Sequence, residues 1–163
     1  MEFIIYSIFG YILECIYSSI IEKRININRG FMLGPYCPIY GISILCISII
    51  TKNHYRYALL LPLVCIFIAL IEYITAFLLE KIFNRSWWDY SRKKYNIKGR
   101  VCLENVIIFG IGAIFIAKRV TPLLSTFLMR TSQAIAIISF LSFIVFILDF
   151  GFSIKRHYLT SQK

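Results

Sequence analysis

Five long apolar runs constrain what this chain of 163 residues can fold into. They lie near residues 2–21, 34–51, 57–79, 101–117 and 131–154. A helix needs about 20 apolar residues to cross the hydrocarbon core of a bilayer. Hydrophobic residues make up 59% of the chain and charged residues only 16%. We therefore predict an all-α, polytopic membrane protein with about five transmembrane helices, forming a single transmembrane domain over residues 1–163.

The fourth and the first of these apolar runs each allow more than one interpretation. Lys118, Arg119 and Pro122 interrupt the fourth apolar run, yet residues 123–129 are apolar again. The segment after residue 117 is therefore either an interfacial turn or a continuation of the fourth helix. The first run begins at Met1 without the basic region of a secretory signal peptide, so we expect it to stay in the mature chain as an anchor.

The basic residues predict the orientation of the helices. Most of the 18 lysines and arginines lie in the loops 22–33 and 80–100 or in the C-terminal tail. The positive-inside rule places these segments in the cytoplasm, with the N-terminus outside and the C-terminus inside. The net charge of +10 is then a topology signal that also attracts anionic membrane lipids. Since the basic residues lie in short loops beside the membrane, we expect no nucleic-acid partner.

One short pattern occurs twice. Residues 14–23 and 72–81 both read E-x-I-x-x-x-[IL]-[IL]-E-K, and each is followed by a related fragment, GPYC at 34–37 and GRVC at 99–102. Either a two-helix unit is repeated in parallel orientation, as helices one–two and three–four with a fifth helix added, or the match is chance in a hydrophobic chain. Repeated membrane units commonly build a shared site between them.

Carboxyl groups lie on four of the predicted helices, each a few turns or less from the predicted cytoplasmic end. An ionisable group inside a bilayer costs about 2.5–3.5 kcal/mol or more unless it is paired or hydrated. These groups therefore either line a polar cavity that serves as a substrate path, or hold the bundle together as buried pairs. The candidate cavity residues are Glu14, Ser18, Glu72, Thr75, Glu104, Asn105 and Asp149.

Helices two and four are both predicted to start at the cytoplasmic face. Free amides and the positive end of the helix dipole favour an anion at such a start. The candidate residues for anion or headgroup binding are Arg29, Gly34, Lys98 and Arg100. They bind either the anionic end of a substrate or an ordinary lipid headgroup. Pro35 and Pro38 also predict irregular backbone before helix two, which lipid tolerates only where protein or water satisfies the freed groups.

Several kinds of chemistry find no support in the sequence. The chain contains no G-x-x-x-x-G-K-[ST] phosphate loop, no H-E-x-x-H and no G-x-S-x-G. Its cysteines lack metal-ligand spacing, and its two histidines lie in a predicted outer loop and in the tail. We assign no catalytic residue, no metal site and no cofactor, and consider the chain more consistent with a non-enzyme.

Two loop signatures resemble a known family. They are RGFMLGPYCPIYG at residues 29–41, and WDYS at 88–91 followed by N-x-x-G-R-x-C-L-E at 96–104. Both resemble the ABC-transporter type IV family of permease-like bacterial membrane proteins, and the resemblance covers roughly residues 5–115. It implies a transport subunit in the bacterial cytoplasmic membrane. It implies no particular substrate and no catalytic residues.

A permease of this kind requires a separate P-loop ATPase, because the chain has no nucleotide site of its own. The loop 80–100 has enough residues to bind such a partner, and the predicted contact is formed by Trp87, Trp88, Asp89 and Tyr90. Asp89-Tyr90-Ser91 is typical of a turn or a helix cap. Five helices are few for a translocation path, so we expect a homodimer or a hetero-oligomer. The substrate is expected to be anionic or lipid-like.

Three other functions remain open on the sequence alone. The chain is an enzyme acting on a lipid or isoprenoid phosphate, a small secondary transporter in which the carboxyl groups carry protons, or a scaffold without transport activity. Magnesium-dependent activity without an ATPase would favour the enzyme, and uptake driven by a pH gradient would favour the secondary transporter. For a scaffold, substitution of the carboxyl groups would affect only stability.

Overall fold

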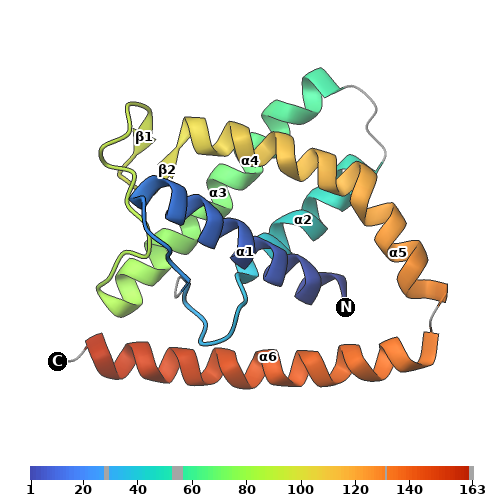
Figure 1. The fold of residues 1–163 in the computed structure, drawn as a ribbon. Helices are drawn as coiled ribbons and strands as arrows, with labels where there is room; N and C mark the ends of the chain where they lie inside the picture. Colours follow the sequence, from blue (N-terminus) through green and yellow to red (C-terminus); the bar gives the residue numbers. More distant parts are fainter. Residues whose placement is uncertain (28–29, 53–56, 131, 162–163) are drawn as a thin grey trace. The chain divides into compact units, whose positions relative to one another are not determined.

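A computed structural model describes residues 1–27, 30–52, 57–130 and 132–161, and these residues are overwhelmingly helical (Figure 1). The elements in chain order are α1 (Glu2–Glu22), α2 (Pro38–Thr51), α3 (Tyr57–Phe83), β1 (Asn96–Ile97), β2 (Val101–Cys102), α4 (Leu103–Phe115), the π-helical segment η1 (Ile116–Val120), α5 (Thr121–Arg130) and α6 (Ser132–Ser161). The two short strands pair into one antiparallel hairpin. The predicted all-α fold class is confirmed.

Four helical segments in the described part of the chain are long and apolar enough to cross a membrane: Glu2–Ile20, Leu59–Phe83, Leu103–Arg130 and Gln133–Ser161. The remaining predicted helix, α2, has 14 residues and is shorter than a usual span. It begins at Pro38 instead of near residue 34. Pro35 and Pro38 explain the difference, because proline disfavours helical backbone in the residue before it but suits the first position of a helix.

The fourth apolar segment continues well beyond residue 117. It runs through η1 into α5 and ends at Arg130. Pro122 has no amide to donate, and its ring would clash with the carbonyl of Lys118, one turn earlier. The backbone widens at this point, and the Thr121 amide bonds to the carbonyl of Ile116, five residues back. A π-type turn therefore carries the helix past the proline, and of the two sequence alternatives the continuation is correct.

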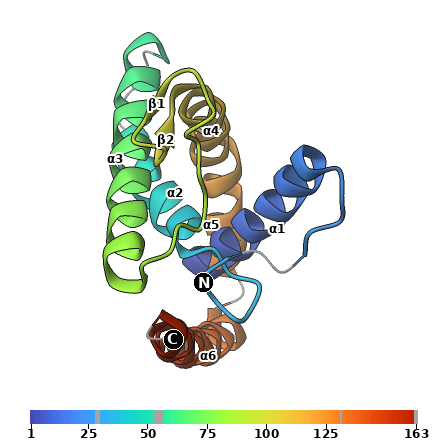
Figure 2. The same ribbon diagram turned by 90° about the vertical axis from the view of Figure 1, so that its left-hand side faces the viewer.

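The chain divides into two compact units. The first comprises Met1–Ile42 with Ser125–Lys163, and the second comprises Ser43–Leu124. In the second unit α3 and α4 lie side by side, with the β1–β2 hairpin in front of them in Figure 2. The single transmembrane domain over residues 1–163 stays a prediction.

The core of the second unit lies between α3 and α4. Val64 is fully buried, and it packs in one cluster with Val106 and Ala113 of α4. Gly110 allows the close approach of the two helices, since a Cβ atom there would lie 3.0 Å from the sulfur of Cys65. Small residues at such contacts are typical of helix packing in membranes.

In the first unit, the connection between α1 and α2 turns back along α1. The Asn26 amide bonds to the Ser19 hydroxyl at 3.0 Å, and the Cys37 amide bonds to the Ser7 carbonyl at 2.8 Å. Between these two contacts the hydroxyl of Tyr11 donates to the carbonyl of Ile27. The contacts thus move from Ser19 to Ser7, a distance of about 18 Å along the helix axis at 1.5 Å per residue. The end of this connection, residues 30–37, is irregular backbone, as predicted.

Candidate functional site

Three side chains on α6 bind the irregular segment before α2. Asp149, Ser153 and His157 are spaced four residues apart, so they form one stripe on the helix surface. The segment they contact, residues 31–36, is called the entry loop below. Figure 1 shows the α1–α2 connection reaching α6. The three side chains supply partners for backbone groups that neither a helix nor a strand satisfies, which is the requirement for irregular backbone within a membrane.

The Asp149 carboxylate accepts two consecutive backbone amides of the entry loop. Its Oδ1 atom lies 3.1 Å from the amide nitrogen of Leu33, and its Oδ2 atom lies 2.7 Å from that of Gly34. Ser153 accepts from the Leu33 amide at 3.0 Å and donates to Asp149 Oδ1 at 3.2 Å. The predicted anion-binding residue Gly34 therefore does contact an anion, and that anion belongs to the chain itself.

The C-terminal end of the stripe holds the other side of the loop. His157 Nε2 lies 2.9 Å from the carbonyl oxygen of Phe31, and the two rings have centroids 5.0 Å apart. Phe31 also packs against Phe150, at 5.8 Å between centroids. His157 is 7% exposed. The sequence interpretation assigned it to the tail and missed it, although its spacing of eight from Asp149 was the available signal.

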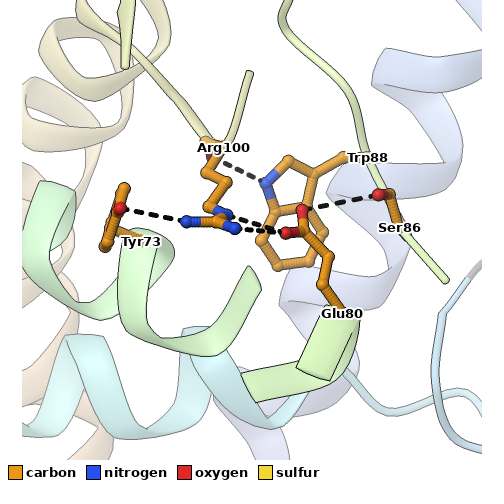
Figure 3. Close-up of polar contacts among 5 residues, drawn as sticks. All are labelled: Tyr73, Glu80, Ser86, Trp88 and Arg100. Atoms are coloured by element: carbon orange, nitrogen blue, oxygen red, sulfur yellow. Dashed lines mark hydrogen bonds and ion pairs between the residues drawn. The ribbon is translucent and has the colours of Figure 1, made fainter. Parts of the chain in front are cut away.

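A second polar network joins the α3–α4 connection to the end of α3. Figure 3 shows the guanidinium group of Arg100 between the carboxylate of Glu80 and the phenol of Tyr73. Arg100 donates to Glu80 Oε2 from two nitrogens, at 2.8 Å and 2.6 Å, and to the Tyr73 hydroxyl at 2.9 Å. The hydrogen bond to Glu80 raises the pKa of Arg100 further above its usual value. Arg100, which was predicted to bind an anion or a lipid headgroup, thus binds the carboxylate of Glu80 in the same chain.

The connection itself, residues 84–102, is folded. The indole nitrogen of Trp88 donates to the carbonyl of Arg100 at 2.8 Å, as Figure 3 also shows. Lys98 and Gly99 both have positive φ, of 52° and 71°, at the tip of the β1–β2 hairpin. The Arg100 amide bonds to the Ile97 carbonyl at 3.0 Å, so Lys98 and Gly99 are the central residues of a turn, and positive φ at both matches type I′. The connection therefore has a defined structure, and it joins the C-terminal end of α3 to the N-terminal end of α4.

The four predicted partner-contact residues make contacts within this element or with the end of α3. Asp89 accepts the Ser91 amide at 2.8 Å and the Ser91 hydroxyl at 3.0 Å, which confirms the predicted turn. The Tyr90 amide bonds to the Gly99 carbonyl at 2.7 Å. Trp87 packs edge-on against Phe83, and Trp88 binds Arg100. Their role in partner binding stays a prediction.

The predicted cavity residues fall into both units. Glu14, Ser18 and Asp149 belong to the first unit, and Glu72, Thr75, Glu104 and Asn105 to the second. Arg29, predicted to bind an anion, lies outside the described residues. The shared cavity across all four carboxyl groups stays a prediction.

The carboxyl groups have different surroundings. Glu14 accepts a hydrogen bond from the Tyr40 hydroxyl at 2.8 Å. Glu72 is 8% exposed and lies one turn after Ile68 of the α3–α4 core. Glu104 is at the surface, with 52% of its side chain exposed, and pairs with Lys93 at 3.0 Å. Glu72 is thus the most enclosed of the four, and the pairing of Glu104 contributes little because both groups are exposed.

The two sequence repeats have related local structures. In each, a helix begins directly after the cysteine of the second fragment: α2 after Cys37 and α4 after Cys102. Three residues beyond those cysteines lie Tyr40, which binds Glu14, and Asn105, which is 3% exposed. The first helices differ in their ends. α1 ends at Glu22, whereas α3 extends to Phe83, three residues past the position that matches Glu22.

These features define a helical membrane protein with two polar networks next to its inter-helix connections. A family model described as "Putative ABC-transporter type IV" matches residues 1–154. The chain belongs to this family of transporter components, which confirms the resemblance seen in the loop signatures. No curated protein and no solved structure matches the chain.

Proposed function

We propose that the protein is the permease-like subunit of a bacterial transporter that works with a separate P-loop ATPase. The observation that carries this proposal is the folded connection between α3 and α4. Movement produced by ATP hydrolysis in another subunit reaches membrane helices only through an element that holds its shape. Residues 84–102 are such an element, tied to α3 by the Arg100–Glu80 ion pair and to α4 by the hydrogen bond from the Leu103 amide to the Tyr95 carbonyl at 2.9 Å.

The connection presents an apolar surface for this partner. Tyr95 and Ile97, on the first strand side of the hairpin, are 57% and 58% exposed. Lys94 and Lys98 flank them and are exposed as well. Aromatic and aliphatic anchors with a charged rim are typical of protein interfaces. We therefore place the ATPase contact at Tyr95 and Ile97 next to the Trp87–Tyr90 segment, and expect an acidic rim on the partner's binding surface.

The orientation follows from the same proposal. The α3–α4 connection lies in the cytoplasm of the bacterial cell, where ATP is available, and the N-terminus lies outside. With α2 only 14 residues long, the second membrane crossing consists of the entry loop together with α2. The substrate is anionic or lipid-like, and the buried polar residues Glu72 and Asn105 line its path.

The test is purification of the tagged protein from its native membrane in mild detergent, followed by mass spectrometry of the proteins bound to it. A stoichiometric P-loop ATPase is expected with the wild type and is lost with the double variant Tyr95→Ser/Ile97→Ser. Ile25→Ser is the matched control, because Ile25 is an equally apolar side chain, 86% exposed, in the α1–α2 connection. A wild-type protein that purifies with lipid alone would contradict the proposed ATPase partner. An ATPase that both variants retain would contradict the proposed contact at Tyr95 and Ile97.

A further inference from the structure

We propose that the entry loop is a carboxylate-binding site, which Asp149 fills from within and which the carboxylate of a small-molecule ligand occupies in its place. The inference rests on the proposed function only for the role of that ligand, which is the transported substrate. The site consists of the amides of Leu33 and Gly34 and the hydroxyl of Ser153.

The donor geometry selects a carboxylate. Two consecutive amides each bind a different oxygen of one carboxyl group, at 3.1 Å and 2.7 Å. Successive backbone amides that point to one place form an anion-binding nest. The Ser153 hydroxyl adds a third donor at 3.2 Å from Oδ1. Hydrogen bonds from neutral donors to an ionised acceptor are about twice as strong as those between neutral groups.

The absence of a side chain at Gly34 leaves room for this anion. A Cβ atom there would lie 2.8 Å from Asp149 Oδ2 and 2.6 Å from the Tyr36 ring, and either approach is closer than real Cβ contacts. Any larger residue would therefore push the carboxylate away from the amides. The loop backbone comes close to the anion only because position 34 is glycine.

The Asp149 carboxylate and the amides that bind it belong to segments far apart in the chain. Replacement of this carboxylate by a ligand therefore changes how the entry loop is held. The entry loop belongs to the α1–α2 connection, while Asp149 lies 115 residues later, on α6. A ligand carboxylate that takes the place of Asp149 removes this link between loop and α6. The ligand thereby weakens the attachment of the loop to α6 without abolishing it, because the Ser153 and His157 contacts remain. It favours this more loosely held loop by the amount of its preferential binding to that state. A substrate displaces the tethered carboxylate through the additional contacts that its remaining atoms make.

The experiment is chemical rescue of the variant Asp149→Ala by formate, measured as the thermal unfolding midpoint of the full-length protein in detergent. The variant should unfold at a lower temperature than the wild type, because the Gly34 amide loses its carboxylate acceptor and the Leu33 amide keeps only the Ser153 hydroxyl. Formate should raise its midpoint in a saturable manner, as expected for a ligand that binds only the folded state. Acetamide, an uncharged compound of similar size, should not, and the wild type should not respond to formate.

Two further variants complete the test. Glu14→Ala removes a carboxylate that accepts from a side-chain donor, the Tyr40 hydroxyl at 2.8 Å, and we expect formate to leave its midpoint unchanged. Asp149→Ser keeps a short acceptor and serves if Asp149→Ala does not fold, with the same rescue expected. Equal effects of formate and acetamide, or no effect of formate on either Asp149 variant, would overturn the inference. None of these measurements involves the ATPase, so their failure is distinct from failure of the proposed function.

Discussion

At the scale of single residues, Arg100 has a role that depends on its shape as well as its charge. Its planar guanidinium group donates to Glu80 from two nitrogens and to Tyr73 from a third, and it lies 5.2 Å from the centre of the Phe77 ring. A lysine ammonium group reproduces the charge but not this fork of donors. The ion pair is also well enclosed, with side-chain exposures of 17% for Arg100 and 29% for Glu80.

We therefore predict that Arg100→Lys lowers the thermal unfolding midpoint by a few degrees. Lys93→Ala removes the exposed pair with Glu104 and should have a smaller effect, since exposed ion pairs contribute little. Differential scanning fluorimetry of the two purified variants compares them directly. If Arg100→Lys were as stable as the wild type, the guanidinium contacts would have no structural importance.

Asp89 gives a prediction about pH. The Ser91 amide, then the Ser91 hydroxyl and the nearby Arg92, hold the pKa of the Asp89 carboxyl below its ordinary value of 3.8. A lowered folded-state pKa means that the carboxylate supports the turn above pH 3.8, and that this support is lost as the pH falls through the lower, folded-state pKa. The Ser91 amide resonance should therefore titrate with a midpoint below 3.8 in an NMR titration. Its acid-dependent shift should disappear in Asp89→Asn, and a midpoint at or above 3.8 would refute the assignment.

At the scale of secondary-structure elements, the entry loop depends on one glycine. We predict that Gly34→Ala destabilises the protein by about 1–3 kcal/mol, the usual range for overpacking. The new Cβ atom would meet Tyr36 and Asp149 at less than 3.0 Å. Gly112→Ala is the matched control, because nothing lies within 4 Å of its added Cβ. The control should be neutral or slightly stabilising, since alanine is the better helix former by about 1 kcal/mol.

Reversible unfolding in mixed micelles measures both glycine variants under the same conditions. Equal stabilities for the two would mean that the loop moves aside without loss of its contacts with α6.

The elements also show what the sequence could and could not predict. Apolar length predicted the spanning helices, since bilayer thickness sets that length independently of tertiary contacts. The course of the fourth segment past Pro122 was not decided by the sequence. A proline ends a helix or merely widens it according to whether nearby amides, here that of the preceding Thr121, find another carbonyl, here that of Ile116. The start of α2 was displaced by Pro35 and Pro38, whose local preference overrides the apolar pattern.

The candidate sites were less predictable than the helices. The importance of Asp149, Gly34 and Arg100 was visible in their residue type and position. Their partners were not visible, since Asp149 and Gly34 are 115 residues apart and only the packing of α6 brings them together. Glu80 was not among the candidate residues, because its pairing with Arg100 depends on the fold of the connection between them.

At the scale of the whole molecule, topology is the property most open to test. We predict that Ile25 and Lys52, which flank the entry loop and α2, lie on opposite sides of the membrane. In a cysteine-free background, Lys52→Cys should react with a membrane-impermeant maleimide in intact cells, and Ile25→Cys only after permeabilisation. Reaction of both in intact cells, or of neither, would show that the entry loop and α2 do not cross the bilayer.

The contacts of the entry loop also have a consequence for biosynthesis. The amides of Leu33 and Gly34 are synthesised more than a hundred residues before their acceptor on α6. Until α6 has left the ribosome and inserted, those backbone groups need water or a chaperone as a partner, because lipid offers none. Insertion of α6 is thus the step that completes the first unit. A nascent chain that stalls before Asp149 would expose this segment to the proteases that monitor membrane proteins.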